Sequence, residues 1–258
     1  MIEKMKSIVT GYNGFIGSAL TAQLILNGHD VILTEDNKDL PERGHFDYFF
    51  YFGSPSSNIL YNDNPHKAIK ETIENFIYIC QYCKEKHIKL IFPSSATIYN
   101  CNNNYAHTKA ALEHIVEAFG IDHLALRIFA GYGVGEEHKK DYASVIYQWC
   151  KGMLKGESPV IFGDGKQTRD FVYIDDIVST IIKNIDKSGV IDIGTGVNTS
   201  FTQIVEIINS FLDSPVAPKY VYSAKPKNYV ESTICVRPLS RSVSIEKGIE
   251  KIIKKMRQ

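Results

Sequence analysis

Three residues in one short stretch of the chain have the types and spacing for acid–base chemistry. Tyr105 and Lys109 are four residues apart, so a helix would present both on one face, and Ser95 precedes them. A free tyrosine, with a pKa of about 10, is a poor base at neutral pH. A neighbouring ammonium group would stabilise its phenolate, and Ser95 could donate a hydrogen bond to a substrate oxygen. The three residues therefore predict proton transfer at a substrate oxygen.

The alternative is that this stretch has no chemical role. Tyr-x-x-x-Lys is common by chance, and "ATIYNCNNN" could be an Asn-rich loop before an ordinary helix. The chemical interpretation requires that Ser95 ends a strand and that Tyr105 begins the next helix. A connection of a few residues is long enough for the two to meet. The surrounding elements therefore decide between the interpretations.

Short apolar runs alternate with amphipathic segments in the first half of the chain. Three helices are predicted there. The first follows the glycine-rich turn and is closed by Gly28, the second begins at the N-cap Asn64 and Pro65, and the third covers residues 105–119 and ends at Gly120. This alternation predicts an α/β fold, a Rossmann-like doubly wound parallel sheet with helices on both faces. The predicted strands are "KSIVTG", "DVILTED", "DYFFYFG", "IKLIFPSS" and "HLALRIFAGYG".

The alternation loosens after Gly131, where short strands are mixed with further helices. This change predicts a small C-terminal substrate lobe that is interleaved with the last strands of the sheet. We expect a dinucleotide-binding domain formed by residues 1–131 and 166–195, and a substrate lobe formed by residues 132–165 and 196–258.

The stretch "VTGYNGFIG" has the pattern of a dinucleotide-binding turn. Gly11, Gly14 and Gly17 follow a predicted strand and open a helix, which allows close backbone approach and presents N–H groups to a pyrophosphate. Glu35, at the end of the next strand, could bind both ribose hydroxyls and would repel a 2′-phosphate, which favours NAD over NADP. The other candidate cofactor contacts are Asn13, Phe15, Ile16, Asp36, Phe52, Gly53, Ser54 and Ser94, together with Tyr105 and Lys109.

The segment between the second and third predicted strands is only about ten residues long, too short for the strand–helix unit that a full dinucleotide fold carries there. We therefore expect a reduced adenine pocket, with Asp39 and Leu40 as candidates for its remnant.

The composition is that of an ordinary globular protein, since 44% of the 258 residues are hydrophobic and 22% are charged. Twenty-nine basic residues balance 29 acidic ones, so no overall field favours nucleic acid or anionic membranes. No run has the pattern of a signal peptide or reaches membrane-spanning length. We therefore expect a soluble, cytoplasmic protein that binds neither nucleic acid nor membrane.

The five cysteines suggest no disulfide framework. Cys80 and Cys83 form a C-x-x-C pair, but they continue an apolar stripe late in a predicted helix, as packing residues do. No second cysteine pair completes a metal site, and the eight histidines show no ligand spacing. We expect no metal.

Several segments resemble the extended short-chain dehydrogenase/reductase family of NAD-dependent nucleotide-sugar epimerases and dehydratases, as in the UDP-glucose 4-epimerases, in a shortened form. The resemblance covers nearly the whole chain. It is carried by "TGYNGFIGSAL", "SSATIY", "YAHTKAALE", "LRIFAGYG", "FGDGKQTRDFVYIDDIV" and "DIGTGVNTSFTQIVEII".

The resemblance implies roles for individual residues. Phe129 would pack near the nicotinamide, and Arg169 would bind the nucleotide diphosphate, although Arg169 could also be a surface arginine in a turn. The stretch "GSPSSNILYNDNP" resembles the substrate-side loop of UDP-glucuronate decarboxylases. The candidate substrate-binding residues are Ser57, Tyr61, Thr97, Ala130, Arg169 and Arg237.

The departures from the family pattern narrow the reaction. Ala96 and Thr97 stand where dehydratases and decarboxylases carry an acidic residue, which disfavours elimination and decarboxylation. Ala130 replaces the usual Asn, and the short connection between Ser95 and Tyr105 predicts a more open substrate pocket.

The leading hypothesis is an NAD-dependent nucleotide-sugar epimerase that forms a transient 4-keto intermediate, with Ser95, Tyr105 and Lys109 as catalytic residues. One alternative is an NAD(P)H-dependent 4-keto reductase. A second is a catalytically silent dinucleotide-binding regulatory protein. The resemblance also implies a homodimer, formed through the helices that begin near Asn64 and Tyr105.

Overall fold

The computed structural model describes residues 4–35, 39–56, 58–100, 103–222 and 230–258. The chain forms two compact units, each built from separate segments. Unit 1 comprises Met1–Ile98, Asn102–Arg127 and Val178–Ile191, and unit 2 comprises Tyr99–Cys101, Ile128–Ile177 and Asp192–Gln258. Of the residues that we expected in the dinucleotide-binding domain, Tyr99–Cys101, 128–131, 166–177 and 192–195 belong to unit 2.

A six-stranded sheet forms the centre of unit 1. The chain runs from β1 to β2 on one side and then to β3 on the other, and these pairs are parallel. This reversal at β1 is the topological switch point of a doubly wound fold, which confirms the predicted fold class. The strands, in sheet order, are β2 (Asp30–Thr34), β1 (Lys6–Thr10), β3 (Tyr48–Tyr51), β4 (Lys89–Ser95), β5 (His123–Ile128) and β9 (Gly189–Ile193).

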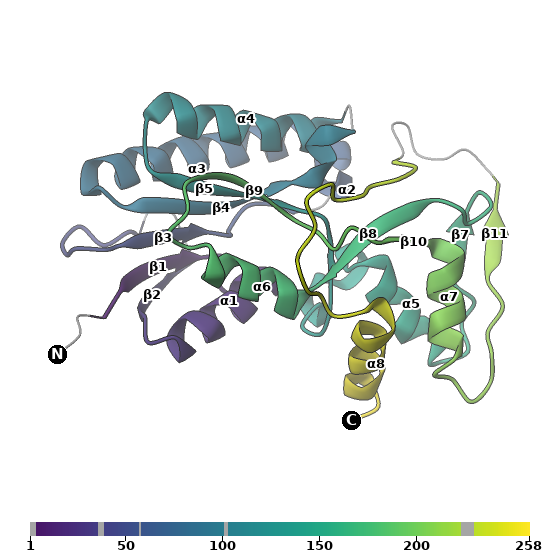
Figure 1. The fold of residues 1–258 in the computed structure, drawn as a ribbon. Coiled ribbons are helices and arrows are strands. Elements are labelled where there is room, and N and C mark those ends of the chain that lie inside the picture. The colour runs from purple at the N-terminus through teal and green to yellow at the C-terminus, as the bar shows by residue number, and fades with distance from the viewer. Residues whose placement is uncertain (1–3, 36–38, 57, 101–102, 223–229) are drawn as a thin grey trace. The chain divides into compact units, whose positions relative to one another are not determined.

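Helices cover both faces of this sheet. α3 (Pro65–Lys86) and α4 (Asn104–Phe119) run side by side over one face, and α1 (Phe15–Leu26) lies on the other (Figure 1). The Asn64 side chain caps α3 by accepting the N–H of Lys67, and Gly120, at a φ of 65°, ends α4. The predicted helices are confirmed, whereas the short α2 (Asn58–Asp63) was not expected.

The core of unit 1 lies between the sheet and the pair α3 and α4. Cys80 and Cys83 are fully buried there, and burial raises the pKa of the Cys80 thiol to about 12. A thiol of this kind is a packing residue, as the apolar stripe predicted.

Unit 2 contains smaller sheets. We expected "HLALRIFAGYG" to form one strand, but it divides at Phe129 into β5 and β6 (Ala130–Tyr132), which join different sheets. β8 (Thr168–Tyr173) pairs with β6 on one side and β10 (Asn198–Ser200) on the other, and β7 (Val160–Phe162) pairs with β11 (Lys219–Val221). The helices are α5 (Val145–Met153), α6 (Ile174–Lys183), which continues into unit 1, α7 (Phe201–Asn209) and α8 (Ile245–Met256).

Within the described part of the chain, no helix is both long enough and apolar enough to cross a membrane.

Candidate active site

Ser95 lies at the carboxyl end of β4 and is 6% exposed. A short 3-10 turn, Ala96–Tyr99, brings Thr97 back, so that its backbone N–H and its hydroxyl donate to Ser95 Oγ at 3.2 and 2.9 Å. Because both of these groups donate, the Ser95 proton is free to act on Tyr105, whose pKa the Ser95 hydroxyl lowers. Thr97 therefore helps to orient Ser95, and its predicted contact with the substrate stays a prediction.

Lys109 lies one turn after Tyr105 on α4 and is 1% exposed. Its ammonium group donates to Ser54 Oγ at 2.9 Å and lies 5.7 Å from the centre of the Tyr105 ring. Burial lowers the pKa of Lys109 to about 8. The fold of unit 1 thus brings together Ser54, Ser95, Tyr105 and Lys109, which the sequence spreads over more than fifty residues.

The ionisation of Tyr105 differs from our expectation. Burial raises the pKa of its hydroxyl to about 12, while the hydrogen bond from Ser95 acts in the opposite direction and the Tyr61 phenol adds to the increase. We expected the Lys109 ammonium to lower this pKa, but in the protein alone the largest effect is burial, which raises it. Tyr105 is therefore a neutral hydrogen-bond donor at neutral pH.

Tyr61, which we predicted at the substrate, lies beside Tyr105. It is fully buried, its hydroxyl is 2.8 Å from Thr72 Oγ1, and its ring packs edge-on against Tyr105 with the centroids 5.4 Å apart. In unit 1 the Tyr61 side chain therefore packs against the Tyr105 ring. Its predicted contact with the substrate stays a prediction.

The turn between β1 and α1 fits a dinucleotide. Gly11 has a φ of 71°, and a Cβ there would lie 2.3 Å from the Phe52 carbonyl carbon, while a Cβ on Gly17 would lie 2.1 Å from the Gly11 oxygen. Only glycine allows this approach. Among the described residues, no side chain caps the start of α1 at Gly14, and the buried Thr10 Oγ1 has no hydrogen-bond partner. These features leave polar groups at the helix start, where a pyrophosphate binds.

Two residues of the turn, Tyr12 and Asn13, connect the turn to Glu35. Sequence reasoning assigned Tyr12 no role and placed Asn13 only among the candidate cofactor contacts. The Tyr12 hydroxyl and the Asn13 amide both donate to Glu35 Oε1, at 2.9 and 2.8 Å. These two hydrogen bonds fix the carboxylate beside the turn. Asp36 and Ser57, which we also predicted at the site, lie outside the described residues.

Sequence reasoning missed a buried network that joins α4 to β4 and β5 near the candidate catalytic residues. Glu113, 7% exposed, accepts from the Ser94 hydroxyl and from Arg127 Nε and Nη2, the last two at 3.0 and 2.6 Å. Ser94 was a predicted cofactor contact, but its side chain is engaged by Glu113. The signal was present, since Glu113 follows Lys109 by one further helical turn.

Unit 2 holds the two candidate phosphate-binding arginines. Arg169, on β8, donates to the Thr168 carbonyl at 2.7 Å and lies 5.6 Å from the centre of the Phe201 ring, whereas Arg237 is exposed. Asp170 is fully buried and organises both neighbourhoods. Its oxygens accept from Thr195 N and Oγ1, Gly196 N and Cys235 N, at 2.8, 2.6, 2.8 and 3.0 Å.

Phe129 and Ala130 lie where β5 gives way to β6. Phe129 is 8% exposed and donates its N–H to the Ile193 carbonyl at 3.0 Å, and Ala130 is half-buried. Both belong to unit 2.

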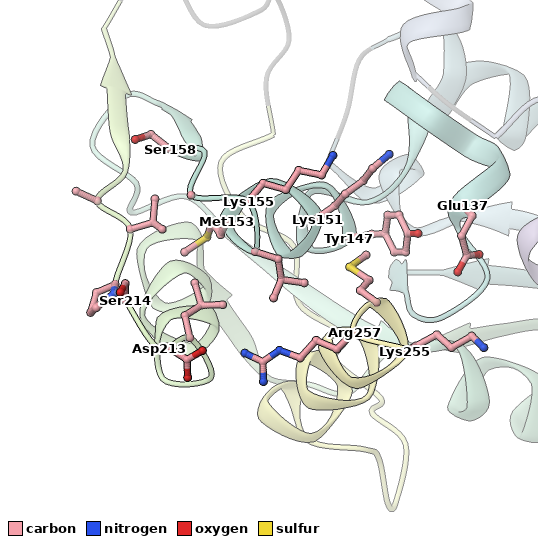
Figure 2. Close-up of a pocket in the computed structure, with 17 residues that line it drawn as sticks. Glu137, Tyr147, Lys151, Met153, Lys155, Ser158, Asp213, Ser214, Lys255 and Arg257 are labelled. Atoms are coloured by element: carbon pink, nitrogen blue, oxygen red, sulfur yellow. The ribbon is translucent and has the colours of Figure 1, made fainter.

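Two cavities lie away from these residues. The larger, of about 1130 Å³, lies in unit 2 at the carboxyl ends of α5 and α8, where Lys151 and Lys255 belong to the last helical turns (Figure 2). Arg257 donates to the carbonyl of Phe211, just after α7, at 2.9 Å. The positive charges of Lys151, Lys255 and Arg257 therefore complement the carbonyl ends of helices. The smaller, of about 650 Å³, is lined by Tyr48 and Lys89 at the amino ends of strands, the edge opposite to ligand sites. We assign neither cavity to the active site.

Comparison with known proteins identifies the family. The model of a family described as "NAD dependent epimerase/dehydratase family" matches residues 7–194. This segment contains the glycine turn, β4 and α4, which carries Tyr105 and Lys109.

Individual relatives agree with this match. A Methanocaldococcus jannaschii protein, named provisionally as a UDP-glucose 4-epimerase, is 28% identical over 254 residues, 78% of this chain and 80% of that protein. The ADP-L-glycero-D-manno-heptose-6-epimerase of Brachyspira hyodysenteriae is 30% identical over 258 residues, 80% and 81% of the two chains. The solved UDP-N-acetylglucosamine 4-epimerase of Methanobrevibacter ruminantium M1, in complex with UDP-N-acetylmuramic acid, is 25% identical with a TM-score of 0.87 over 99% of each chain. The chain therefore belongs to the NAD-dependent epimerase/dehydratase family, and its cofactor is NAD.

Proposed function

We propose that the protein is a nucleotide-sugar epimerase that oxidises carbon 4 of the sugar ring transiently and returns the hydride to the opposite face. The observation that carries the proposal is the buried set of Ser95, Tyr105 and Lys109 in unit 1, in which the Ser95 hydroxyl lowers the pKa of Tyr105 and the Lys109 ammonium lies 5.7 Å from the centre of the Tyr105 ring. Relatives whose names specify 4-epimerisation support the choice of carbon.

Each residue of the set has a distinct task in this reaction. NAD, when bound, supplies the hydride acceptor and a positive charge. Tyr105 removes the proton from the sugar hydroxyl and later returns it, and the Lys109 ammonium stabilises the phenolate in between. Ser95 donates to the same substrate oxygen. Since the pKa of Tyr105 is about 12 in the protein alone, proton removal depends on added positive charge.

The binding residues are proposed on the same basis. Glu35 binds the adenosine ribose through Oε2, because Oε1 already accepts from Tyr12 and Asn13. Arg169 and Arg237 bind the diphosphate, for which a guanidinium group is suited.

A second candidate function is epimerisation at an exocyclic carbon of a nucleotide-linked sugar. It is favoured by the relative named as a heptose-6-epimerase, which has 30% identity to this chain. Both reactions oxidise and re-reduce one secondary alcohol, so the same three residues serve either. The elimination reactions of dehydratases are not proposed, because Ala96 and Thr97 offer no acid after Ser95.

The test is turnover of UDP-, dTDP-, GDP-, CDP- and ADP-sugars that carry deuterium at the candidate carbon. We expect an inverted centre that retains its deuterium, with no net consumption of NAD, and loss of the reaction in Tyr105→Phe. The position of the label distinguishes carbon 4 from an exocyclic carbon. Stoichiometric consumption of NAD(P)H with a keto-sugar would indicate the reductase. Tight NAD binding without turnover of any sugar would indicate the silent protein.

We also propose a homodimer formed through α3 and α4. Tyr78 of α3, 42% exposed, offers an apolar surface for it. Light scattering of the purified protein tests this, with Tyr78→Lys expected to yield monomers.

A further inference from the structure

Two long side chains of α4 reach neighbouring residues of β4. Tyr105 and Glu113 are eight residues apart, about 12 Å along a helix. Their partners Ser95 and Ser94 are adjacent, about 3.8 Å apart between Cα atoms. The Ser94–Glu113 hydrogen bond therefore ties α4 to the end of β4, beside the point where the Ser95 hydroxyl acts on Tyr105.

Glu113 also forms an ion pair with Arg127. Its two carboxylate oxygens accept hydrogen bonds from Arg127 Nε and Nη2, with Nη2–Oε2 at 2.6 Å, and we call this paired contact the fork. The Glu113 and Arg127 side chains are only 9% and 23% exposed. Such a pair costs desolvation and is weak evidence of a stabilising role, since apolar residues of similar size often serve as well. Its position, with Glu113 one helical turn after Lys109, suggests a role in placing groups and balancing charge.

We infer that Glu113 and Arg127 are positioning residues for the proposed reaction: their fork fixes α4 against β4 and β5, and their opposite charges keep the catalytic Tyr105 and Lys109 free of a net local field. The inference rests on the proposed function for its kinetic test. Loss of the fork lets α4 shift, and displacement of a reacting group by about 1 Å costs on the order of a hundredfold in rate.

Loss of either charge alone has a second effect. Glu113→Gln leaves the Arg127 cation, which favours the Tyr105 phenolate, whereas Arg127→Met leaves the Glu113 carboxylate, which disfavours it. The two variants should thus move the Tyr105 titration in opposite directions. A purely structural role would move both in the same direction, because either loss loosens the same packing.

Other groups around Tyr105 do not produce this pattern. The ionisable groups in contact with it are Tyr61 from α2 and Lys109 from its own helix, and both are unchanged in the variants. β4 and the turn after it offer the hydroxyls of Ser94, Ser95 and Thr97. The charges of the first turns of α3 lie on exposed side chains that pair with one another, as Lys67–Glu71 and Lys70–Glu74.

The experiment compares Glu113→Gln, Arg127→Met and the double variant in the NAD-bound protein. The titration of Tyr105 is read as the difference in phenolate absorbance between each variant and the same variant that also carries Tyr105→Phe. In addition, kcat and KM are measured as functions of pH. We expect opposite shifts in the single variants, return towards the wild-type value in the double variant, and a fall in kcat of about 10- to 100-fold with KM little changed. Glu74→Gln, which breaks the exposed pair on α3, is the control and should change neither readout.

If the Tyr105 titration shifted in the same direction in Glu113→Gln and Arg127→Met, the inference would be overturned. It would also be overturned if both kcat and the titration stayed unchanged in these variants. Arg127→Lys keeps the charge but not the fork, so it should lower kcat without moving the titration. Arg127→Gln, which removes the charge but keeps a polar side chain, replaces Arg127→Met if that variant does not fold. The absorbance titration needs no sugar. Opposite shifts in a protein that turns over no sugar would therefore retain the electrostatic inference while the proposed function fails.

Discussion

Glu113 in unit 1 and Asp170 in unit 2 are both buried carboxylates, but their hydrogen-bond donors differ in kind. Glu113 accepts from the side chains of Ser94 and Arg127, which belong to two strands of one sheet. Asp170 accepts from three backbone N–H groups and a threonine hydroxyl, which belong to the loop after β9 and to the segment at Cys235.

The kind of donor in each region suits the candidate residues that lie near it. Side-chain donors on strands fix one rigid element against another, as chemistry at Tyr105 and Lys109 requires. Backbone donors fix the course of loops, which is sufficient to set the surroundings of Arg169 and Arg237. We therefore expect the first region to control rate and the second to control affinity for the sugar nucleotide.

Removal of the Tyr105 hydroxyl is the strongest test of this division. Tyr105→Phe should lower kcat by about 10²- to 10⁴-fold, because proton transfer to and from the sugar is lost. Nucleotide affinity, measured by calorimetry with UDP or ADP, should stay unchanged. Tyr142→Phe, which removes an exposed hydroxyl in unit 2, is the control. A comparable loss of nucleotide affinity in Tyr105→Phe would contradict the division.

Replacement of Asp170 should have the next largest effect, on stability. In Asp170→Asn an amide N–H₂ would face donors that now reach a carboxylate oxygen, at a cost of about 3–4 kcal/mol in the free energy of unfolding. Denaturant unfolding measures this, with the exposed Asp213→Asn as control, expected within about 0.5 kcal/mol of wild type. NAD affinity should survive in the folded fraction, and its loss there would show that Asp170 also supports unit 1.

Lys109 should make stability depend on pH in a way that no group described in unit 2 does. Its pKa is about 8 when folded and 10.5 ordinarily, so below about pH 8 both states carry the charge and the folded state bears the full cost of burial. Between pH 8 and 10 the folded state loses the proton first, and the wild type gains stability as pH rises.

Lys109→Met should consequently be more stable than wild type at about pH 7, by at most about 3 kcal/mol, and the gap should narrow towards about pH 10. Unfolding curves at both pH values test this. A gap that widens with pH would mean that Lys109 is stabilised, not strained, by its site. Lys89→Met, at the opposite edge of the sheet, provides a comparison for a lysine that pairs with Asp122 at 3.4 Å.

Arg169 should give the smallest effect. Arg169→Lys keeps the charge but loses the planar fork, so KM for the sugar nucleotide should rise about tenfold with kcat nearly unchanged. Steady-state kinetics measure this change in KM. Lys166→Met, which removes an exposed cation nearby in sequence, is the control. A fall in kcat instead would place Arg169 with the rate-controlling residues of unit 1.

Much of the fold and part of the site followed from the sequence. The spacing of Tyr105 and Lys109, the N-cap Asn64 and the glycine turn at Gly11 act within a few residues, so local rules were enough to predict their elements. The break at Phe129 was not predicted, because "HLALRIFAGYG" has strand composition throughout and only pairing with different sheets divides it.

The sequence by itself determined the α/β alternation, the dinucleotide turn and the shared helical face of the catalytic pair. Tertiary structure decided the ionisation of Tyr105 and Lys109, because burial that only the folded chain creates raises one pKa and lowers the other. It also decided that Tyr61 supports Tyr105 and that Glu113 meets Arg127. These contacts join side chains from different elements, and no short-range pattern specifies which of them meet.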